Sequence, residues 1–283
     1  MRVLVVPNLG KEQAVQVACE LTTWLSARGI ERVMSAEDAR GSGLDGLGVA
    51  PSEIGEPALA VALGGDGTIL KAVHILGEVE VPVLGVNLGR RGFLSGATAR
   101  HDIRQAVTAA LAGDVRVERR ATLDAHVVME GRSVGRYRAL NELVVGRGTA
   151  GRVIEVAVAV NGIALLDFSC DGVIVATSTG STAYALSAGG PIVSPEVPCL
   201  LVVPVAPHTL ESRTLVVGSS DVVELSLPNP ARRDACIQID GDLMPCRRAI
   251  ESIEVRRCEH DVLLVKLDGR DFYETVGAEF LGR

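Results

Sequence analysis

The residue best placed for chemistry is a single carboxylate among three glycines, in the string LGGDGTIL (63–70). Glycine costs chain entropy, so Gly64, Gly65 and Gly67 around Asp66 need a reason. A glycine loop between a strand and a helix presents backbone N–H groups to an anion. A phosphotransferase needs a carboxylate in such a loop, because an attacking hydroxyl must lose its proton. The alternative is a plain Asp-Gly turn.

Hydroxyl side chains form a second candidate site, in the string TSTGSTAYALSAGG (177–190). Five of the six residues at 177–182 carry a hydroxyl, whereas a helix start needs only one Ser or Thr as its cap. The surplus predicts a polar wall that hydrogen-bonds a sugar or a phosphate. A Ser/Thr-capped helix start without a ligand is the alternative.

Asn141 and Glu142 form a third candidate site, because they open an otherwise apolar strand in LNELVVGRG (140–148). Two polar residues at a strand edge are often only solvated. Alternatively, this amide and carboxylate bind the hydroxyl groups of a ribose or an amide group. The local sequence leaves both interpretations open.

Several familiar site patterns are missing from the sequence. It has neither the P-loop pattern nor the GxGxxG dinucleotide fingerprint, and it lacks the GxSxG elbow of a serine hydrolase. The cysteines form no CxxC pair, and the histidines form no metal pattern. The sequence therefore assigns no metal ligand to the protein side chains.

The composition is typical of a globular protein with an aliphatic core. The 283 residues are 47% hydrophobic and 22% charged, and only 3% are aromatic. A formal charge of −7 without a long basic run argues against a nucleic-acid partner. The apolar N-terminal run is too short for a signal peptide, and no stretch approaches the roughly 18 apolar residues of a membrane helix. We therefore expect a cytoplasmic protein without a membrane partner.

The hydrophobic periodicity changes near residue 115. Residues 1–115 alternate apolar strands with helical spacing, which predicts an α/β domain with a parallel sheet. Residues 116–265 alternate in period two between turn residues, which predicts a β-rich domain. The expected fold class is an α/β N-terminal domain plus an all-β, sandwich-like C-terminal domain. The last segment, 266–283, has the spacing of a helix.

Six strings in this order resemble those of the NAD kinase family: GGDGT (64–68), NLGRRGFL (87–94), NE (141–142), TSTGSTAYALSAGGPI (177–192), PVAPHTL (204–210) and DGD (240–242). The first string alone is shared with lipid kinases and is similar to a loop of phosphofructokinases. The long hydroxyl-rich string together with the Asn-Glu pair is much more specific. The resemblance implies the two-domain NAD kinase architecture, with residues 266–283 packed back on the first domain.

The resemblance also implies a reaction, in which ATP phosphorylates the 2′-hydroxyl of the adenosine ribose of NAD to give NADP and ADP. Asp66 would be the general base that accepts the hydroxyl proton. The phosphate-donor site would contain Gly64, Gly65, Gly67, Thr68 and Lys71. The NAD site would contain Asp66, Gly67, Asn141, Glu142, Arg152, Asp171, Thr182, Ala183, Tyr184, Ala185, Leu186, Ser187 and Asp242.

The family likeness further implies a divalent ion, Mg²⁺, which bridges the phosphates, and a homodimer or homotetramer. Polyphosphate is an alternative donor. Ser178 and Thr214 stand where proline is usual in the family, and the Arg90–Arg91 pair is less typical. Two rival functions are a lipid kinase of the diacylglycerol or sphingosine type and a dinucleotide-binding sensor without catalysis. The hydroxyl-rich string favours a nucleotide over acyl chains, and Asp66 favours catalysis over sensing.

Overall fold

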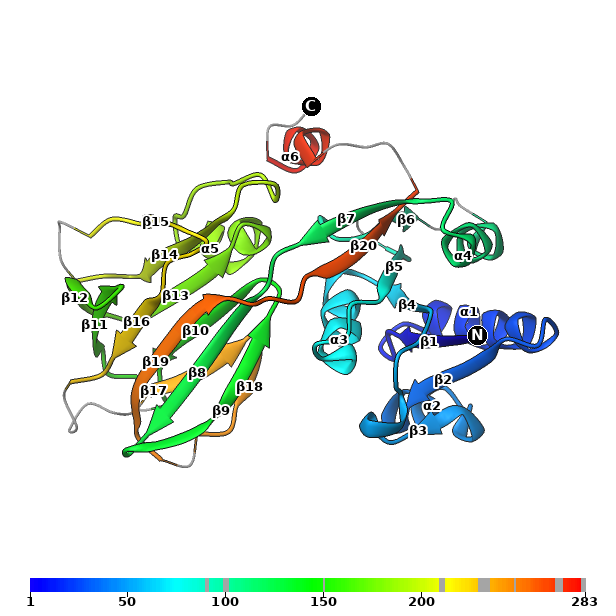
Figure 1. Cartoon of the computed structure of the whole chain (residues 1–283), viewed down its shortest axis with the longest axis horizontal. Helices are drawn as coiled ribbons and strands as arrows, with labels where there is room; N and C mark the ends of the chain where they lie inside the picture. Colours follow the sequence, from blue (N-terminus) through cyan, green and yellow to red (C-terminus); the bar gives the residue numbers. More distant parts are fainter. Residues whose placement is uncertain are drawn as a thin grey trace. The chain divides into compact units, whose positions relative to one another are not determined.

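The structure is a computed structural model that describes residues 1–89, 92–98, 102–149, 151–208, 212–228, 235–246, 248–267 and 272–280 (Figure 1). The chain divides into two compact units, one of Met1–Arg120 with His260–Arg283 and one of Ala121–Glu259. The periodicity of the sequence places these boundaries at 115 and 265. Arg90 and Arg91 lie outside the described residues, as do the last two residues of PVAPHTL.

The first unit is built on a mostly parallel sheet with the strand order β3-β2-β1-β4-β5-β20-β7, and β6 lies beside β5. Its strands are β1 (Arg2–Pro7), β2 (Glu31–Ser35), β3 (Gly48–Val49), β4 (Leu59–Gly64), β5 (Pro82–Asn87), β6 (Ala97–Thr98), β7 (Arg116–Arg120) and β20 (Val262–Lys266). Strand β20 pairs parallel with β5 and antiparallel with β7. A strand from near the end of the chain therefore joins the N-terminal sheet.

Helices cover both faces of this sheet. They are α1 (Glu12–Ser26), α2 (Ala36–Gly41), α3 (Asp66–Leu76) and α4 (Ile103–Ala112). The unit also contains the helix α6 (Phe272–Phe280) and the 3₁₀ turns η1 (Asp45–Leu47) and η2 (Pro51–Glu53). The buried residues of α1 and α4 pack with Leu84 and Val86 of β5. Helix α3 packs on the other face, because a Cβ on Gly85 would overlap the side chain of Ile69.

The glycine loop lies between the fully buried strand β4 and helix α3. Gly65 is the N-cap residue and Asp66 is the first helical residue, where its negative charge is favourable to the helix dipole. Gly77 ends the helix with a φ of 59°. The Asp-Gly pair therefore starts a helix and does not form a hairpin turn.

The second unit contains two antiparallel sheets, with the strand orders β15-β14-β13-β10-β17-β18 and β12-β11-β16-β19-β8-β9. The strands of the first of these sheets are β10 (Glu142–Arg147), β13 (Gly172–Thr177), β14 (Cys199–Val205), β15 (Leu215–Gly218), β17 (Ala235–Ile239) and β18 (Asp242–Met244). Those of the other are β8 (Leu123–Met129), β9 (Arg132–Ala139), β11 (Ile154–Val160), β12 (Ile163–Cys170), β16 (Val223–Ser226) and β19 (Ile250–Arg257).

One apolar core joins these two sheets, because the inward residues of both belong to it, as with Val145 of β10 and Val156 of β11. The opposite face of β10, β13 and β14 is covered by a smaller cluster that includes Ala185. That residue lies in the short helix α5 (Tyr184–Ser187), which follows the 3₁₀ turn η3 (Thr179–Thr182). Strand β10 is therefore buried on both faces. The predicted fold class, an α/β unit and a β sandwich, is confirmed.

No helix in the described ranges is long and apolar enough to cross a membrane.

Candidate active site

The Asp66 carboxylate is held by the backbone of a separate segment. Its Oδ2 accepts the N–H of Phe93 at 2.8 Å, and its Oδ1 accepts the N–H of Leu94 at 3.3 Å. Desolvation raises the pKa of Asp66, whereas these two hydrogen bonds and the charges of Lys266 and Arg120 act in the opposite direction. Asp66 is therefore a fixed carboxylate with a raised proton affinity, which suits a general base.

Gly92 makes room for this arrangement. A Cβ at this position would overlap the Asp66 carboxyl group. Only glycine lets the segment come close enough for both N–H groups to reach Asp66. Gly92 belongs to the string NLGRRGFL (87–94), but the sequence alone indicates no role for it.

A cavity of about 370 Å³ opens beside the glycine loop, and the residues that give it its chemistry are Asn8, Lys11, Gly65, Gly67, Thr68 and Lys71. A Cβ on Gly65 or Gly67 would meet open space, so the loop backbone is accessible from the cavity. Gly64 differs, because its Cβ would overlap the Thr68 side chain. Lys71 is paired at 2.7 Å with the buried Asp38. The cavity therefore offers backbone donors and Lys11 to an anion. Its wall also contains Lys71, which is paired with Asp38, and the carboxylate of Glu37.

The Asn141–Glu142 pair is fixed by Asp240 in the turn after β17. The Asp240 carboxylate accepts the N–H groups of Leu140, Asn141 and Glu142 at 2.8, 2.7 and 3.1 Å. Its own N–H donates to the carbonyl of Glu142 at 3.0 Å. The first residues of this strand are therefore rigid.

The carboxyl group of Glu142 is buried, and one of its oxygen atoms lacks a hydrogen bond to the described residues. The residue is 5% exposed, and its Oε2 has no hydrogen-bond partner among the residues that the structure describes. Burial and the nearby Asp240 charge raise its pKa to about 8, although the backbone N–H of Tyr184 lowers it. A buried polar atom without a partner fits a site that a ligand completes.

Most hydroxyl groups of the hydroxyl-rich turn (177–182) form hydrogen bonds with backbone groups of the same unit. Thr177 Oγ1 donates to the carbonyl of Leu140 at 2.6 Å, and Ser178 Oγ donates to the carbonyl of Val197. Ser181 Oγ bonds both the N–H and the carbonyl of Val193 at 3.1 Å. These bonds fix the turn next to the Asn-Glu pair. The hydroxyl groups of Thr177, Ser178 and Ser181, which were expected to bind a ligand, therefore bond to the protein itself.

The other predicted NAD-site residues have varied surroundings. Ala185 is fully buried, whereas Tyr184 is 41% exposed. Thr182 donates to the carbonyl of Thr179 at 3.3 Å. Asp171 lies 3.4 Å from Arg147, measured from Oδ1 to Nε. Exposed residues are Arg152, Ser187 and Asp242, while Ala183 and Leu186 are half-buried.

Sequence reasoning missed Lys11, Gly92, Asp240 and Lys266. Asp240 and Gly92 belong to strings that it compared with the NAD kinase family, so the signal was present for both. Lys11 follows the apolar strand β1 in PNLGK, a position at which α/β proteins often place ligand-binding loops. No local signal marks Lys266, because its contacts come from residues more than 170 positions away.

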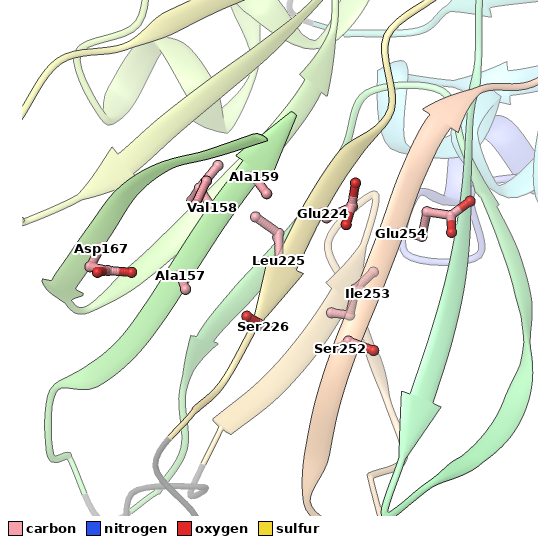
Figure 2. A pocket seen from close by; sticks show the side chains of 11 residues that line it. Ala157, Val158, Ala159, Asp167, Glu224, Leu225, Ser226, Ser252, Ile253 and Glu254 are labelled. Atoms are coloured by element: carbon pink, nitrogen blue, oxygen red, sulfur yellow. The ribbon is translucent and has the colours of Figure 1, made fainter. Parts of the chain in front are cut away.

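A second hollow, of about 240 Å³, lies on the sheet of β11, β16 and β19 (Figure 2). Figure 2 shows Glu224 and Glu254 on neighbouring strands, where their Cα atoms pair in the sheet register. Ala157 and Ser226 lie beside them in the same hollow. Its acidic lining is unsuited to phosphate groups, so this hollow is not a nucleotide site.

The Asp66 carboxylate lies at the start of a helix after a glycine loop, and a rigid amide–carboxylate pair opens a strand of the β sandwich. These two features fit a small-molecule kinase of two domains. Family models agree with this class. The model described as ATP-NAD kinase N-terminal domain matches residues 3–115, and the one described as ATP-NAD kinase C-terminal domain matches residues 140–267. The chain belongs to the NAD kinase family, and its activity is that of an NAD kinase.

Individual relatives cover most of the chain. An NAD kinase of Geobacter metallireducens is 40% identical over 261 residues, which is 92% of this chain and 91% of the relative. An NAD kinase of Lachnoclostridium phytofermentans is 33% identical over 98% of this chain and 97% of the relative. These comparisons support neither the lipid kinase nor the sensor.

Two solved structures share the fold. Yeast NADH kinase complexed with NADH superposes with a TM-score of 0.88 at 25% identity, over 100% of this chain and 87% of that chain. An NAD kinase from Archaeoglobus fulgidus in complex with ATP gives a TM-score of 0.73 at 27% identity, over 98% of both chains.

Proposed function

We propose that this chain transfers the γ-phosphoryl group of ATP to the 2′-hydroxyl of the adenosine ribose of NAD, with Asp66 as the general base. The observation that carries the proposal is the two-point hold on the Asp66 carboxylate by Phe93 and Leu94. A base must be oriented toward the proton that it accepts, and its raised pKa favours that acceptance. Because phosphoryl transfer depends mainly on alignment and charge, one fixed base is sufficient.

The donor phosphates occupy the cavity beside the glycine loop. Gly65 and Gly67 expose their backbone there, and Lys11 and Lys71 bring positive charge. Thr68 adds a hydroxyl at the same wall. The Archaeoglobus NAD kinase in complex with ATP supports ATP as the donor. Gly64 contributes indirectly by letting Thr68 approach β4.

The NAD ribose bonds the Asn141–Glu142 pair. Glu142 has an unpartnered Oε2, and with a pKa of about 8 its carboxyl group is mostly protonated at neutral pH. A protonated carboxyl group both donates and accepts, which matches the hydroxyl groups of a ribose. The yeast NADH kinase complexed with NADH supports a dinucleotide as the acceptor. Thr182 to Ser187, Arg152, Asp171 and Asp242 are the further candidates for this site.

Mg²⁺ would be bound with the donor phosphates, whose charge it would neutralise. Within the described part of the chain, no three His, Cys, Asp or Glu side chains form a metal-binding group. A cytoplasmic homodimer or homotetramer is the assembly that we propose, by analogy with the family.

The test is to incubate the purified protein with ATP, Mg²⁺ and NAD and to measure NADP. The wild-type chain should form NADP, and Asp66→Asn should lower kcat by about 10²–10⁴-fold with an unchanged melting temperature. Asp45→Asn, at an exposed position, is the matched control and should keep wild-type turnover. Near-normal kcat in Asp66→Asn would end the assignment of the base. Phosphorylated diacylglycerol without NADP, in a parallel assay, would favour the lipid kinase.

A further inference from the structure

We infer that Lys266 is a positioning residue of the phosphoryl-transfer centre, because it holds the backbone segment that orients the Asp66 carboxylate. The inference rests on the proposed role of Asp66 as the base. Lys266 is the last residue of β20, which is far from Asp66 in the sequence and lies in the same unit.

The Lys266 side chain forms hydrogen bonds with two carbonyl groups of the segment that holds Asp66. Its Nζ donates to the carbonyl of Leu94 at 3.3 Å and to the carbonyl of Ser95 at 3.2 Å. The N–H of the same Leu94 donates to Asp66 Oδ1. A single residue therefore contacts the Lys266 ammonium with its carbonyl and the Asp66 carboxylate with its N–H. If the ammonium group moves, Leu94 moves with it, and the N–H groups that orient the Asp66 carboxylate shift as well.

The backbone around Lys266 fixes the other end of the segment. The N–H of Leu267 donates to the carbonyl of Gly96 at 3.1 Å, and the N–H of Gly96 donates to the carbonyl of Gly85 at 3.1 Å. A Cβ on Gly96 would overlap the carbonyl of Val265. The segment from Phe93 to Gly96 is therefore held between β5 and β20, and the Lys266 side chain adds two hydrogen bonds to it.

Charge adds to this geometric role. The groups that act on Asp66 from the neighbouring strands are Lys266 of β20 and Arg120 of β7. Glu118 of β7 acts on both cations, and it pairs with the buried Arg120 at 2.7 Å. Lys266 is therefore one of two cations that lower the pKa of Asp66, in addition to the hydrogen bonds from Phe93 and Leu94. Without it, the pKa of Asp66 would rise further.

The experiment compares Lys266→Met with Lys266→Arg in the full-length enzyme. The Met variant should lower kcat at pH 7 by about ten- to a hundredfold, because the segment loosens and the Asp66 carboxylate loses its orientation. The acid limb of its kcat profile should move to higher pH, because the positive charge that lowers the pKa of Asp66 is removed. The Arg variant keeps the charge and two donors, so it should recover most of the turnover and the wild-type limb.

The matched control is Arg116→Met, because Arg116 pairs with Lys266 in the register of β7 and β20 and is exposed. It should keep the wild-type profile. A uniform loss in both Lys266 variants, with an unchanged acid limb, would indicate a merely structural role and overturn the inference, as would wild-type kcat in Lys266→Met. If Lys266→Met does not fold, Lys266→Gln is read by the same criteria.

Asp66→Asn separates the two hypotheses in the same assay. If Asp66→Asn is inactive while Lys266→Met behaves as wild type, the base is supported and the role of Lys266 is rejected. If Asp66→Asn remains active, the proposed base is itself wrong, whatever Lys266→Met does.

Discussion

Gly180 packs so closely on Asn141 that a Cβ on the glycine would overlap the carbonyl oxygen of the asparagine. The atoms that it would meet belong to the backbone, so no side-chain rotation relieves the overlap. The carbonyl of Asn141 also accepts the N–H of Thr177 at 2.8 Å. The hydroxyl-rich turn and the Asn-Glu pair are therefore one rigid piece.

Substitution Gly180→Ala should separate this turn from the Asn-Glu pair. We expect a loss of about 1–3 kcal/mol in the free energy of unfolding and a higher KM for NAD. Chemical denaturation and NADP formation measure the two effects. Gly46→Ala is the control, because its Cβ would meet open space. Unchanged stability and KM in Gly180→Ala would mean that the contact is unimportant.

Glu142→Gln should make the protein more stable at pH 8. Burial raises the pKa of Glu142 from 4.5 to about 8, so between these values the folded state binds more protons than the unfolded state. The free energy of unfolding therefore falls as the pH rises through that window. A neutral Gln has no charge to bury, so the free energy of unfolding at pH 8 should be higher than in the wild type by roughly 2–4 kcal/mol.

Denaturation of wild type and Glu142→Gln at pH 5 and pH 8 measures this effect. The gain should be much smaller at pH 5, where the wild-type side chain is protonated in the folded state. The exposed Glu196→Gln should show no such difference. An equal gain at both pH values would contradict the raised pKa.

Asp240→Asn should raise the KM for NAD by about tenfold with little change in the KM for ATP. The amide keeps one acceptor oxygen, but its NH₂ group faces backbone N–H groups of the Asn-Glu strand. Calorimetric titration with NAD and steady-state kinetics check this split. Asp242→Asn is the comparison, because this exposed side chain should matter less. A larger effect at Asp242 would reverse the assignment.

Gly92→Ala should lower kcat by about ten- to a hundredfold while leaving the melting temperature nearly unchanged. The new methyl group would overlap the Asp66 carboxyl, which must rotate away from the N–H groups of Phe93 and Leu94. Gly277→Ala in α6, where a Cβ meets open space, should keep its activity. A fully active Gly92→Ala would show that Asp66 does not need this orientation.

Much of the fold was predictable from local patterns. Buried strands such as β4 and amphipathic helices such as α1 follow from the spacing of apolar residues. The pairing of β20 with β5 and β7 was not, because a five-residue apolar strand fits either unit equally well. Only the competition among sheet edges decides where such a strand pairs.

In the candidate site, too, some features could be predicted from the sequence and others could not. The sequence by itself determined the chemical groups, namely Asp66 in its glycine loop and the Asn141–Glu142 pair. It also indicated hydroxyls at 177–182 as ligand donors, yet the structure uses Thr177, Ser178 and Ser181 within the protein.

Only the tertiary structure decided what holds the reactive groups in place. Asp240, Gly92 and Lys266 act across at least 26 positions of sequence, through hydrogen bonds and close contacts that exist only in the folded chain. The raised pKa of Glu142 has the same origin, because desolvation depends on the atoms packed around a group. Residue types set which reactions are available, and packing sets the orientation and proton affinity with which they occur.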